Sequence, residues 1–330
     1  MNIIDFRQLS SLKAISINFG IALPYLESVI ANPDKFYTLL KIRKKGRSKY
    51  KYRKVYKADE QLALLHSEIR SQIEFNIYDR KSQLKSEYIT PYAYGFIKKR
   101  GIRENAKVHL NKTHLLNLDI TDFFKTINSR DVYNVFVKLG TPDEGAKNLA
   151  ILCTLQDKLE EGLHTSPVIS NIHCHDLDIQ IAKLAKKQKF SYSRYADDLT
   201  FSSNTRLPYL EQIEKILNSF RFNLNDEKTR YSKKGQAQYV TGLSISNDKY
   251  PRIPKIMKSQ LRAELYFMEK YGVASHCHRQ GIEQEDISQE LNRIQGWIWY
   301  MYGIEPDLAA QYKEIFDDCI GISELDYELG

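Results

Sequence analysis

The stretch that decides the predicted fold is residues 190–203, F-S-Y-S-R-Y-A-D-D-L-T-F-S-S. Residues that favour strands lie on both sides of Ala196-Asp197-Asp198, and this pattern predicts a β-hairpin with a tight turn. The turn carries two adjacent carboxylates, which repel each other unless a cation is close. Carboxylate oxygens suit Mg²⁺, an ion that proteins often share with a phosphate substrate. Taken alone, the turn also fits a solvated acidic loop, so a third acid is needed to separate the two interpretations.

A third carboxylate, Asp119, ends the short apolar run of residues 115–120, which predicts a strand. If this strand joins the hairpin in one sheet, Asp119, Asp197 and Asp198 come together. Two divalent ions roughly 3.5–4 Å apart need such a set of acids to stabilise an in-line phosphoryl displacement. A lone Asp119 fits a strand-end cap about as well, but the combination of three acids favours the metal site.

The composition narrows the class of protein. The chain has 330 residues, a formal net charge of +8 and 22 tyrosines, and this mixture favours a polyanionic partner whose phosphates and bases contact Lys, Arg and Tyr. No apolar run reaches about 18 residues, so we expect no membrane span, and the N-terminus lacks a signal-peptide pattern. The four cysteines have no C-x-x-C spacing, which predicts reduced thiols in a cytoplasmic protein.

Residues 41–57 form the most basic segment, with ten Lys or Arg and no acid. Gly46 and Ser48 predict a turn between two strands, the second of which alternates Tyr with Lys or Arg. Such a ribbon suits contact with phosphates and bases, through Lys44, Lys45 and Arg47 above all. The alternative interpretation is a solvated charged hairpin.

Periodicity and breakers predict the remaining elements. Two short helices are expected within residues 15–30, separated at Pro24. Further helices are expected at residues 59–80, 129–138, 146–159, 166–187 and 208–220, and short strands at 222–224 and 239–245. From about residue 247 the pattern becomes helical, with helices expected at 256–271, 287–301 and 308–316.

Four motifs in this order resemble those of reverse transcriptases. L-D-I-T-D-F-F (118–124) resembles motif A, E-G-L-H-T-S-P-V-I-S-N (161–171) motif B, S-R-Y-A-D-D-L-T (193–200) motif C and N-D-E-K-T (225–229) the lysine segment of motif D. The resemblance implies an α+β, right-hand polymerase fold. Residues 1–114 would hold N-terminal helices and fingers with the basic hairpin, 115–246 an antiparallel-sheet palm, and 247–330 a helical thumb that recognises RNA.

Two shorter matches resemble retron reverse transcriptases in particular. Asn105 and His109 fit an N-A-x-x-H pattern before motif A, and Thr241 and Gly242 fit a V-T-G pattern after motif D. Retron enzymes bind their own structured non-coding RNA, prime from a 2′-hydroxyl within it and make a short DNA joined to it. They act in antiphage defence beside an effector protein. The resemblance thus implies as partners a cognate RNA, its DNA product, dNTPs and an effector, with no membrane.

The resemblance also implies metal and nucleotide roles for single residues. Asp119, Asp197 and Asp198 would hold two Mg²⁺ ions, for which Mn²⁺ substitutes, and the backbone carbonyl of Ile120 would complete the shell of the second ion. Arg53 occupies the place of a triphosphate-binding arginine, whose planar guanidinium suits bidentate contacts.

Other roles in the same site follow from the resemblance. Lys51 is a second candidate for contact with the triphosphate, and Lys228 would protonate the leaving pyrophosphate. Phe124 matches the steric gate that excludes a 2′-hydroxyl, whereas Phe123 fits core packing better. Nucleic-acid contacts are expected from a wider set: Lys44, Lys45, Arg47, Asn105, His109, Ser166, Pro167, Tyr195, Thr241 and Gly242.

One residue departs from the family pattern, and two function classes stay open. Glu161 stands where motif B usually has Gln; an ionised Glu accepts but does not donate hydrogen bonds, and its charge repels phosphates. The leading function is RNA-templated DNA synthesis by a retron enzyme. The alternatives are another bacterial reverse transcriptase, defence-associated or intron-related, and a catalytically weak RNA-binding relative. The H-C-H triplets at 173–175 and 276–278 lack the spacing of a tetrahedral zinc site.

Overall fold

The computed structural model describes residues 3–43, 52–78 and 84–321. Its contacts divide the chain into two compact units, Met1–Gly101 with Leu116–Tyr231, and Ile102–Leu115 with Ser232–Gly330. The division into fingers, palm and thumb at residues 114 and 246 stays a prediction. Lys44, Lys45, Arg47 and Lys51 lie outside the described residues. Across the described parts, no helix combines the length and apolar character that a membrane span requires.

The central sheet confirms the predicted hairpin and its neighbouring strand. It has four strands in the order β4-β5-β3-β6, which are β4 (Ser191–Tyr195), β5 (Asp198–Ser203), β3 (His114–Asp119) and β6 (Arg230–Lys233). Strands β4 and β5 are antiparallel, with Tyr195 opposite Asp198. The strand predicted at 222–224 is reduced to a single bridge between Leu224 and Ile120. Strand β6, which lies between the strands predicted at 222–224 and 239–245, was not predicted.

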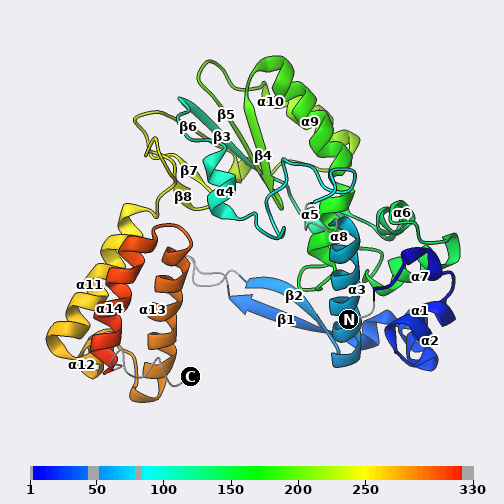
Figure 1. Ribbon diagram of the computed structural model, residues 1–330, viewed down its shortest axis with the longest axis horizontal. Helices are drawn as coiled ribbons and strands as arrows, with labels where there is room; N and C mark the ends of the chain where they lie inside the picture. Colours follow the sequence, from blue (N-terminus) through cyan, green and yellow to red (C-terminus); the bar gives the residue numbers. More distant parts are fainter. Residues whose placement is uncertain (1–2, 44–51, 79–83, 322–330) are drawn as a thin grey trace. The chain divides into compact units, whose positions relative to one another are not determined.

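Helices make up much of the rest of the first unit. Helix α9 packs on β4 and α10 packs on α9 (Figure 1). The helices are α1 (Leu12–Phe19), α2 (Leu23–Ala31), α3 (Glu60–Ile77), α5 (Phe123–Thr126), α6 (Ser129–Lys138), α7 (Asp143–Leu152), α8 (Ser166–His173), α9 (His175–Gln188) and α10 (Leu210–Ser219), with short 3-10 turns η1 (Phe6–Gln8), η2 (Pro33–Phe36) and η3 (Asp226–Lys228).

Three predicted helix boundaries were wrong. The first two helices separate at Gly20, whose φ of 65° ends α1, while Pro24 lies in the first turn of α2, where its missing N–H costs nothing. The helix expected at 166–187 is interrupted at Cys174, where ψ is 3°. The helix expected to reach residue 159 ends at Leu152.

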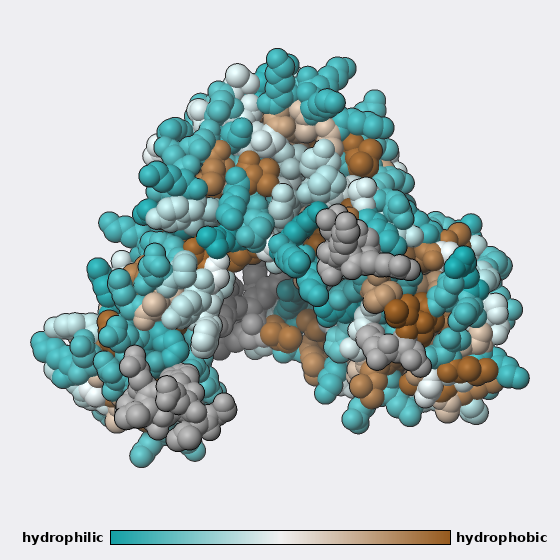
Figure 2. Space-filling model, in the orientation of Figure 1, coloured by the Kyte–Doolittle hydropathy of each residue, from teal (hydrophilic) through white to brown (hydrophobic). Residues whose placement is uncertain are grey.

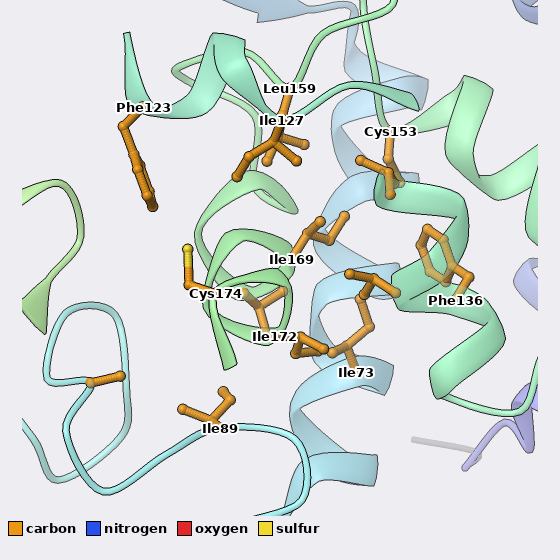
Figure 3. Packing of buried hydrophobic residues seen from close by; sticks show 14 of the residues in the cluster. Ile73, Ile89, Phe123, Ile127, Phe136, Cys153, Leu159, Ile169, Ile172 and Cys174 are labelled. Atoms are coloured by element: carbon orange, nitrogen blue, oxygen red, sulfur yellow. The ribbon is translucent and has the colours of Figure 1, made fainter. Parts of the chain in front are cut away.

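The core of the first unit joins helices to the sheet. The helix predicted at residues 59–80 is confirmed as α3, and its Leu62, Leu65, Ile69, Ile73 and Ile77 are all buried. Figure 3 shows Ile73 packing beside side chains of α6 and α8, among them Phe136, Ile169 and Ile172. Burying large apolar side chains in this way is the main stabilisation of such a fold, at about 1.5–3 kcal/mol for each fully buried residue.

A two-stranded ribbon confirms the pairing of two strands in the basic segment, while the predicted turn at Gly46 and Ser48 lies outside the described residues. Strands β1 (Tyr37–Arg43) and β2 (Tyr52–Ala58) pair antiparallel, from Tyr37 opposite Ala58 to Arg43 opposite Tyr52. The ribbon contacts the motif B loop, since the Tyr56 backbone N–H donates to the Glu161 carbonyl at 3.2 Å. The apolar side chains Leu39, Leu40 and Ile42 are exposed, so the ribbon is not held by a core of its own.

The second unit is mainly helical. Helices α11, α13 and α14 lie side by side (Figure 1). Its elements are α4 (Ile102–Lys107), β7 (Tyr239–Val240), β8 (Leu243–Ser244), α11 (Lys255–Tyr271), α12 (Val273–Arg279), η4 (Gln284–Asp286), α13 (Ile287–Tyr302) and α14 (Pro306–Ile320). Helix α12 was not predicted, and it is separated from α11 by Gly272 with φ 81°. Figure 2 shows a surface dominated by hydrophilic side chains, with hydrophobic ones in small separate groups.

Candidate active site

The end of β3 meets the turn between β4 and β5. Asp119 is the last residue of β3 and is only 7% exposed. The next backbone N–H, of Ile120, donates to the carbonyl oxygen of Asp197 at 3.0 Å. This bond ties the strand of the third acid to the turn of the other two, as the sequence predicted, so Asp119, Asp197 and Asp198 occupy one region.

The segment after α10 brings a cation to Asp119. The Asn225 backbone N–H donates to the Asp119 carbonyl at 2.8 Å, and η3 follows directly. Lys228, at the end of η3, places its Nζ 2.8 Å from both carboxylate oxygens of Asp119. Desolvation acts against the charge, but Asp119, Asp197 and Asp198 outweigh it and raise the pKa of Lys228. The predicted proton donor is therefore held charged beside the acids.

Asp197 and Asp198 carry negative charge that the single positive charge of Lys228, bonded to Asp119, does not balance. Burial, followed by the charges of Asp119 and Glu161, raises the pKa of Asp197. Burial, followed by the charges of Asp197 and Asp119, raises the pKa of Asp198 to about 6. A shift in this direction means that the surroundings disfavour the ionised forms. An added positive charge in this region would lower the free energy of the ionised carboxylates.

This charge balance suits a hard divalent cation. Such ions take carboxylate and carbonyl oxygens as ligands, and Asp119, Asp197, Asp198 and the Ile120 carbonyl supply that donor chemistry. In the described part of the chain, however, no three or more His, Cys, Asp or Glu are already gathered as a metal-binding group. Both oxygens of Asp119 are bonded to Lys228 instead, so this lysine supplies the counter-charge at Asp119.

A buried hydrogen-bond network contacts the backbone of the turn that carries Asp197 and Asp198. Arg194, on β4, is fully buried and donates Nε and Nη2 to the two oxygens of Asp178 at 2.8 and 2.9 Å. The same carboxylate accepts from Tyr192 at 2.8 Å and from Thr90 at 2.9 Å. Arg194 Nη1 also donates to the carbonyl of Ala196 at 3.3 Å, which precedes Asp197. We name Arg194, Asp178, Tyr192, Thr90 and Asn171 the buried layer.

The motif B asparagine completes the buried layer. Asn171 accepts from Arg194 at 3.1 Å and donates to the Gly95 carbonyl at 2.8 Å. Gly95 is required because a Cβ there would lie 2.8 Å from the backbone nitrogen of Ala196. The turn itself places Ala196 at φ 56°, a left-handed conformation that needs support from its surroundings.

Sequence reasoning missed the buried layer as a functional feature. One signal was available: Asp178 lies among Leu177, Ile181 and Ala182 on the apolar face of α9. A carboxylate on such a face needs a buried cationic partner. The identity of that partner, Arg194, is visible only in the structure.

The predicted triphosphate-binding arginine is paired with the residue that departs from motif B. Arg53 Nε donates to Glu161 Oε2 in an ion pair. The pair is partly exposed, with 55% of the Arg53 side chain and 31% of the Glu161 side chain accessible. Glu161, and to a lesser extent Asp197, raises the pKa of Arg53. The pair thus lies within electrostatic range of the Asp197-Asp198 turn.

The two phenylalanines after Asp119 differ in burial. Phe123 is 4% exposed and stacks on Phe222, with ring centroids 5.5 Å apart. Phe124 is half-buried and contacts Phe123 edge-on at 5.2 Å. The prediction that Phe123 belongs to the core is confirmed. The predicted role of Phe124 as a steric gate stays a prediction.

Three predicted nucleic-acid contacts lie in the first unit. Tyr195 is half-buried, with its ring 6.3 Å from that of Phe96. Pro167 is half-buried, but Ser166 is 1% exposed and its hydroxyl donates to the Glu160 carbonyl at 2.7 Å. The predicted direct contact is therefore not supported for Ser166, whose side chain fixes the loop before α8.

Four predicted contacts lie in the second unit. Asn105 and His109 are both 0% exposed, so their side chains do not lie on a surface that RNA reaches, and the predicted direct contact is not supported for them. Thr241 and Gly242 form the turn between β7 and β8, with φ of 47° and 83°. Their role in RNA binding stays a prediction.

Comparison with known proteins places these observations in a family. The model of the family "Reverse transcriptase (RNA-dependent DNA polymerase)" matches residues 42–245, a span that includes Arg53, the three aspartates and Lys228. Members of this family generally use divalent metal ions.

Three curated relatives cover most of the chain. The chain is similar to the Retron Ec86 reverse transcriptase of Escherichia coli, with 27% identity over 86% of this chain and 82% of the relative. It is similar to the Retron Ec83 reverse transcriptase of Escherichia coli, with 29% identity over 70% and 75%. It is also similar to the Retron Se72 reverse transcriptase of Salmonella heidelberg, with 26% identity over 97% and 82%. The chain therefore belongs to the reverse transcriptase family, with the right-hand polymerase fold, as an RNA-directed DNA polymerase of the retron type.

Proposed function

We propose that this polymerase copies part of its own structured non-coding RNA into a short DNA that stays joined to that RNA through a 2′-hydroxyl. It acts in the cytoplasm, in antiphage defence, beside an effector protein. The observation that carries the proposal is the meeting of Asp119 at the end of β3 with the Asp197-Asp198 turn. The retron identity of these three relatives supports the choice of RNA.

In the proposed reaction a primer hydroxyl releases its proton to water and attacks the α-phosphorus of a dNTP, and the bond from that phosphorus to pyrophosphate breaks. Asp119, Asp197 and Asp198 would hold two Mg²⁺ ions, with the Ile120 carbonyl as a further ligand and Mn²⁺ as a substitute. When bound, such ions activate the attacking oxygen and stabilise the leaving one.

The remaining residues bind and orient the nucleotide. The Arg53 guanidinium contacts the triphosphate, and its planar fork matches phosphate oxygens. Lys228, which its acidic neighbours keep protonated, gives its proton to the departing pyrophosphate. The ring of Phe124 packs against the sugar and leaves no room for a 2′-hydroxyl.

Replacement of one acid tests the polymerase chemistry. Asp197→Asn is expected to abolish primer extension while RNA affinity stays near that of the wild type, because an amide lacks the charge that metal catalysis needs. Extension at even a tenth of the wild-type rate would contradict the assignment. A protein that binds RNA and extends no primer even as wild type would favour the weak RNA-binding relative.

Nucleic acid that copurifies from the native locus tests the retron function. The expected product is RNA covalently joined to short DNA through a 2′ linkage, which a debranching enzyme separates. Active enzyme with no such product would favour another bacterial reverse transcriptase. Phage challenge of cells with and without the locus tests the defence role.

A further inference from the structure

Arg53 contacts Glu161 through only one of its three guanidinium nitrogens. The bond is made by Nε alone, and among the described residues the two terminal amino groups of the guanidinium have no hydrogen-bond partner. A guanidinium has five N–H donors in a fixed plane, so this single contact leaves the fork available. The pair therefore fixes the orientation of Arg53 without using the donors that suit phosphate.

The backbones that carry the two side chains are also joined. The Tyr56 N–H, three residues beyond Arg53 on β2, donates to the Glu161 carbonyl at 3.2 Å. The next residue of the loop, Gly162, has φ 100°, and a Cβ there would lie 2.4 Å from Val55 Cγ1 and 2.6 Å from the Tyr56 carbonyl oxygen. The loop and the strand are thus in close contact, and the carboxylate is held beside the guanidinium.

The charges explain why an acid is tolerated at this position. A lone ionised Glu161 would repel phosphates. Pairing with Arg53 compensates that charge locally. Glu161 stands where motif B usually has Gln, and its contact with Arg53 is charge-assisted. Such a contact is stronger than a hydrogen bond between neutral groups.

We propose that Glu161 is a positioning residue that holds Arg53 by Nε, so that the terminal amino groups of the guanidinium are oriented for the triphosphate of the incoming dNTP. The inference rests on the triphosphate-binding role given to Arg53 in the proposed function. The proposal explains why Glu161 stands in place of the usual Gln. It also predicts that the effect of replacing Glu161 on dNTP affinity depends on the presence of Arg53.

The test is dNTP affinity without chemistry, measured on complexes whose primer ends in a dideoxynucleotide. Arg53→Ala is expected to weaken affinity about tenfold or more, since it removes charge-assisted hydrogen bonds. Glu161→Ala is expected to weaken it about two- to tenfold, because a long side chain must then be ordered on binding. Glu161→Gln should restore most of the loss through its amide oxygen.

The double variant decides whether the two residues act together. Arg53→Ala with Glu161→Ala should be no weaker than Arg53→Ala alone, since Glu161 acts only through the arginine. Glu74→Ala breaks the exposed Arg70–Glu74 pair on α3 and is the matched control, with unchanged affinity expected.

Three outcomes would overturn the proposal. Tighter dNTP binding in Glu161→Ala would mean that Glu161 sequesters the arginine. Additive losses in the double variant would mean that Glu161 acts independently, for example on the template. An Arg53→Ala variant with wild-type dNTP affinity would show that Arg53 does not bind the nucleotide. Failure of the proposed function would be distinguished by a different result, namely a wild-type enzyme that extends no primer.

Discussion

Two ion pairs near the Asp197-Asp198 turn have similar chemistry and opposite environments. Arg194 and Asp178 are both completely inaccessible to solvent, whereas Arg53 and Glu161 are 55% and 31% accessible. The buried pair is bidentate and extends to Tyr192, Thr90 and Asn171, while the exposed pair is a single contact. The difference suggests a division of work, in which the buried layer fixes the backbone of the turn and the accessible pair remains free to meet a substrate.

The largest expected effect comes from breaking the buried pair. Arg194→Met leaves the Asp178 carboxylate buried without a counter-charge, and we expect a loss of about 3–5 kcal/mol in the free energy of unfolding. Arg194→Met with Asp178→Leu removes both charges and should recover most of that loss, yet DNA synthesis should stay low because the Ala196 carbonyl has lost its donor. Urea unfolding and primer extension measure the two effects, and a single variant that costs under about 1 kcal/mol would refute the distinction.

The two phenylalanines after Asp119 sharpen the same comparison between buried and accessible positions. Phe124→Val should admit ribonucleotides about ten- to two-hundred-fold better, because a packed pocket discriminates against a misfit group by about 1–3 kcal/mol. Phe123→Val should instead lower stability by about 1–4 kcal/mol through lost packing, with sugar choice unchanged. Single-nucleotide incorporation of dNTP and rNTP is the measurement. Relaxed discrimination in the Phe123 variant would move the gate by one residue.

A buried titratable group on α3 gives a smaller, pH-dependent effect. Burial lowers the pKa of His66 to about 4, although its bond to the Leu152 carbonyl opposes the shift. The unfolded side chain has a pKa of about 6.5, so between these values the unfolded state binds the additional proton and stability falls as the pH falls. From pH 7 to pH 5 the wild type should lose about 1–2 kcal/mol more than His66→Gln. Unfolding curves at both pH values test this, and equal losses would show that His66 is not buried as a neutral side chain.

The smallest expected effect comes from breaking the accessible pair. Glu161→Ala should change the free energy of unfolding by less than about 1 kcal/mol, as is usual for a partly exposed ion pair. The same variant should weaken dNTP binding, so that function changes more than stability. Urea unfolding beside nucleotide titration provides the check, and a stability loss as large as that of Arg194→Met would remove the contrast between the two pairs.

The amino-acid pattern was enough to predict the local helices and strands and to single out Asp119, Asp197 and Asp198. Strand-favouring residues on both sides of Ala196-Asp197-Asp198 were enough to predict the hairpin, and the helical period was enough to predict α3. The end of the apolar run at Asp119 placed the third carboxylate. These features depend on neighbours within a few residues, and for that reason a pattern in the chain reveals them.

Tertiary structure alone decided the partners of the charged side chains. Arg53 pairs with a residue 108 positions away and Lys228 with one 109 positions away, and nothing in the local pattern selects either. The same holds for Asn105 and His109, which the motif favoured as RNA contacts and which packing buries. The packing of whole helices and strands decides which charged side chains lie next to each other and how deeply each is buried. Burial in turn determines the free-energy cost of an unpaired charge. Neither quantity exists before the chain is folded.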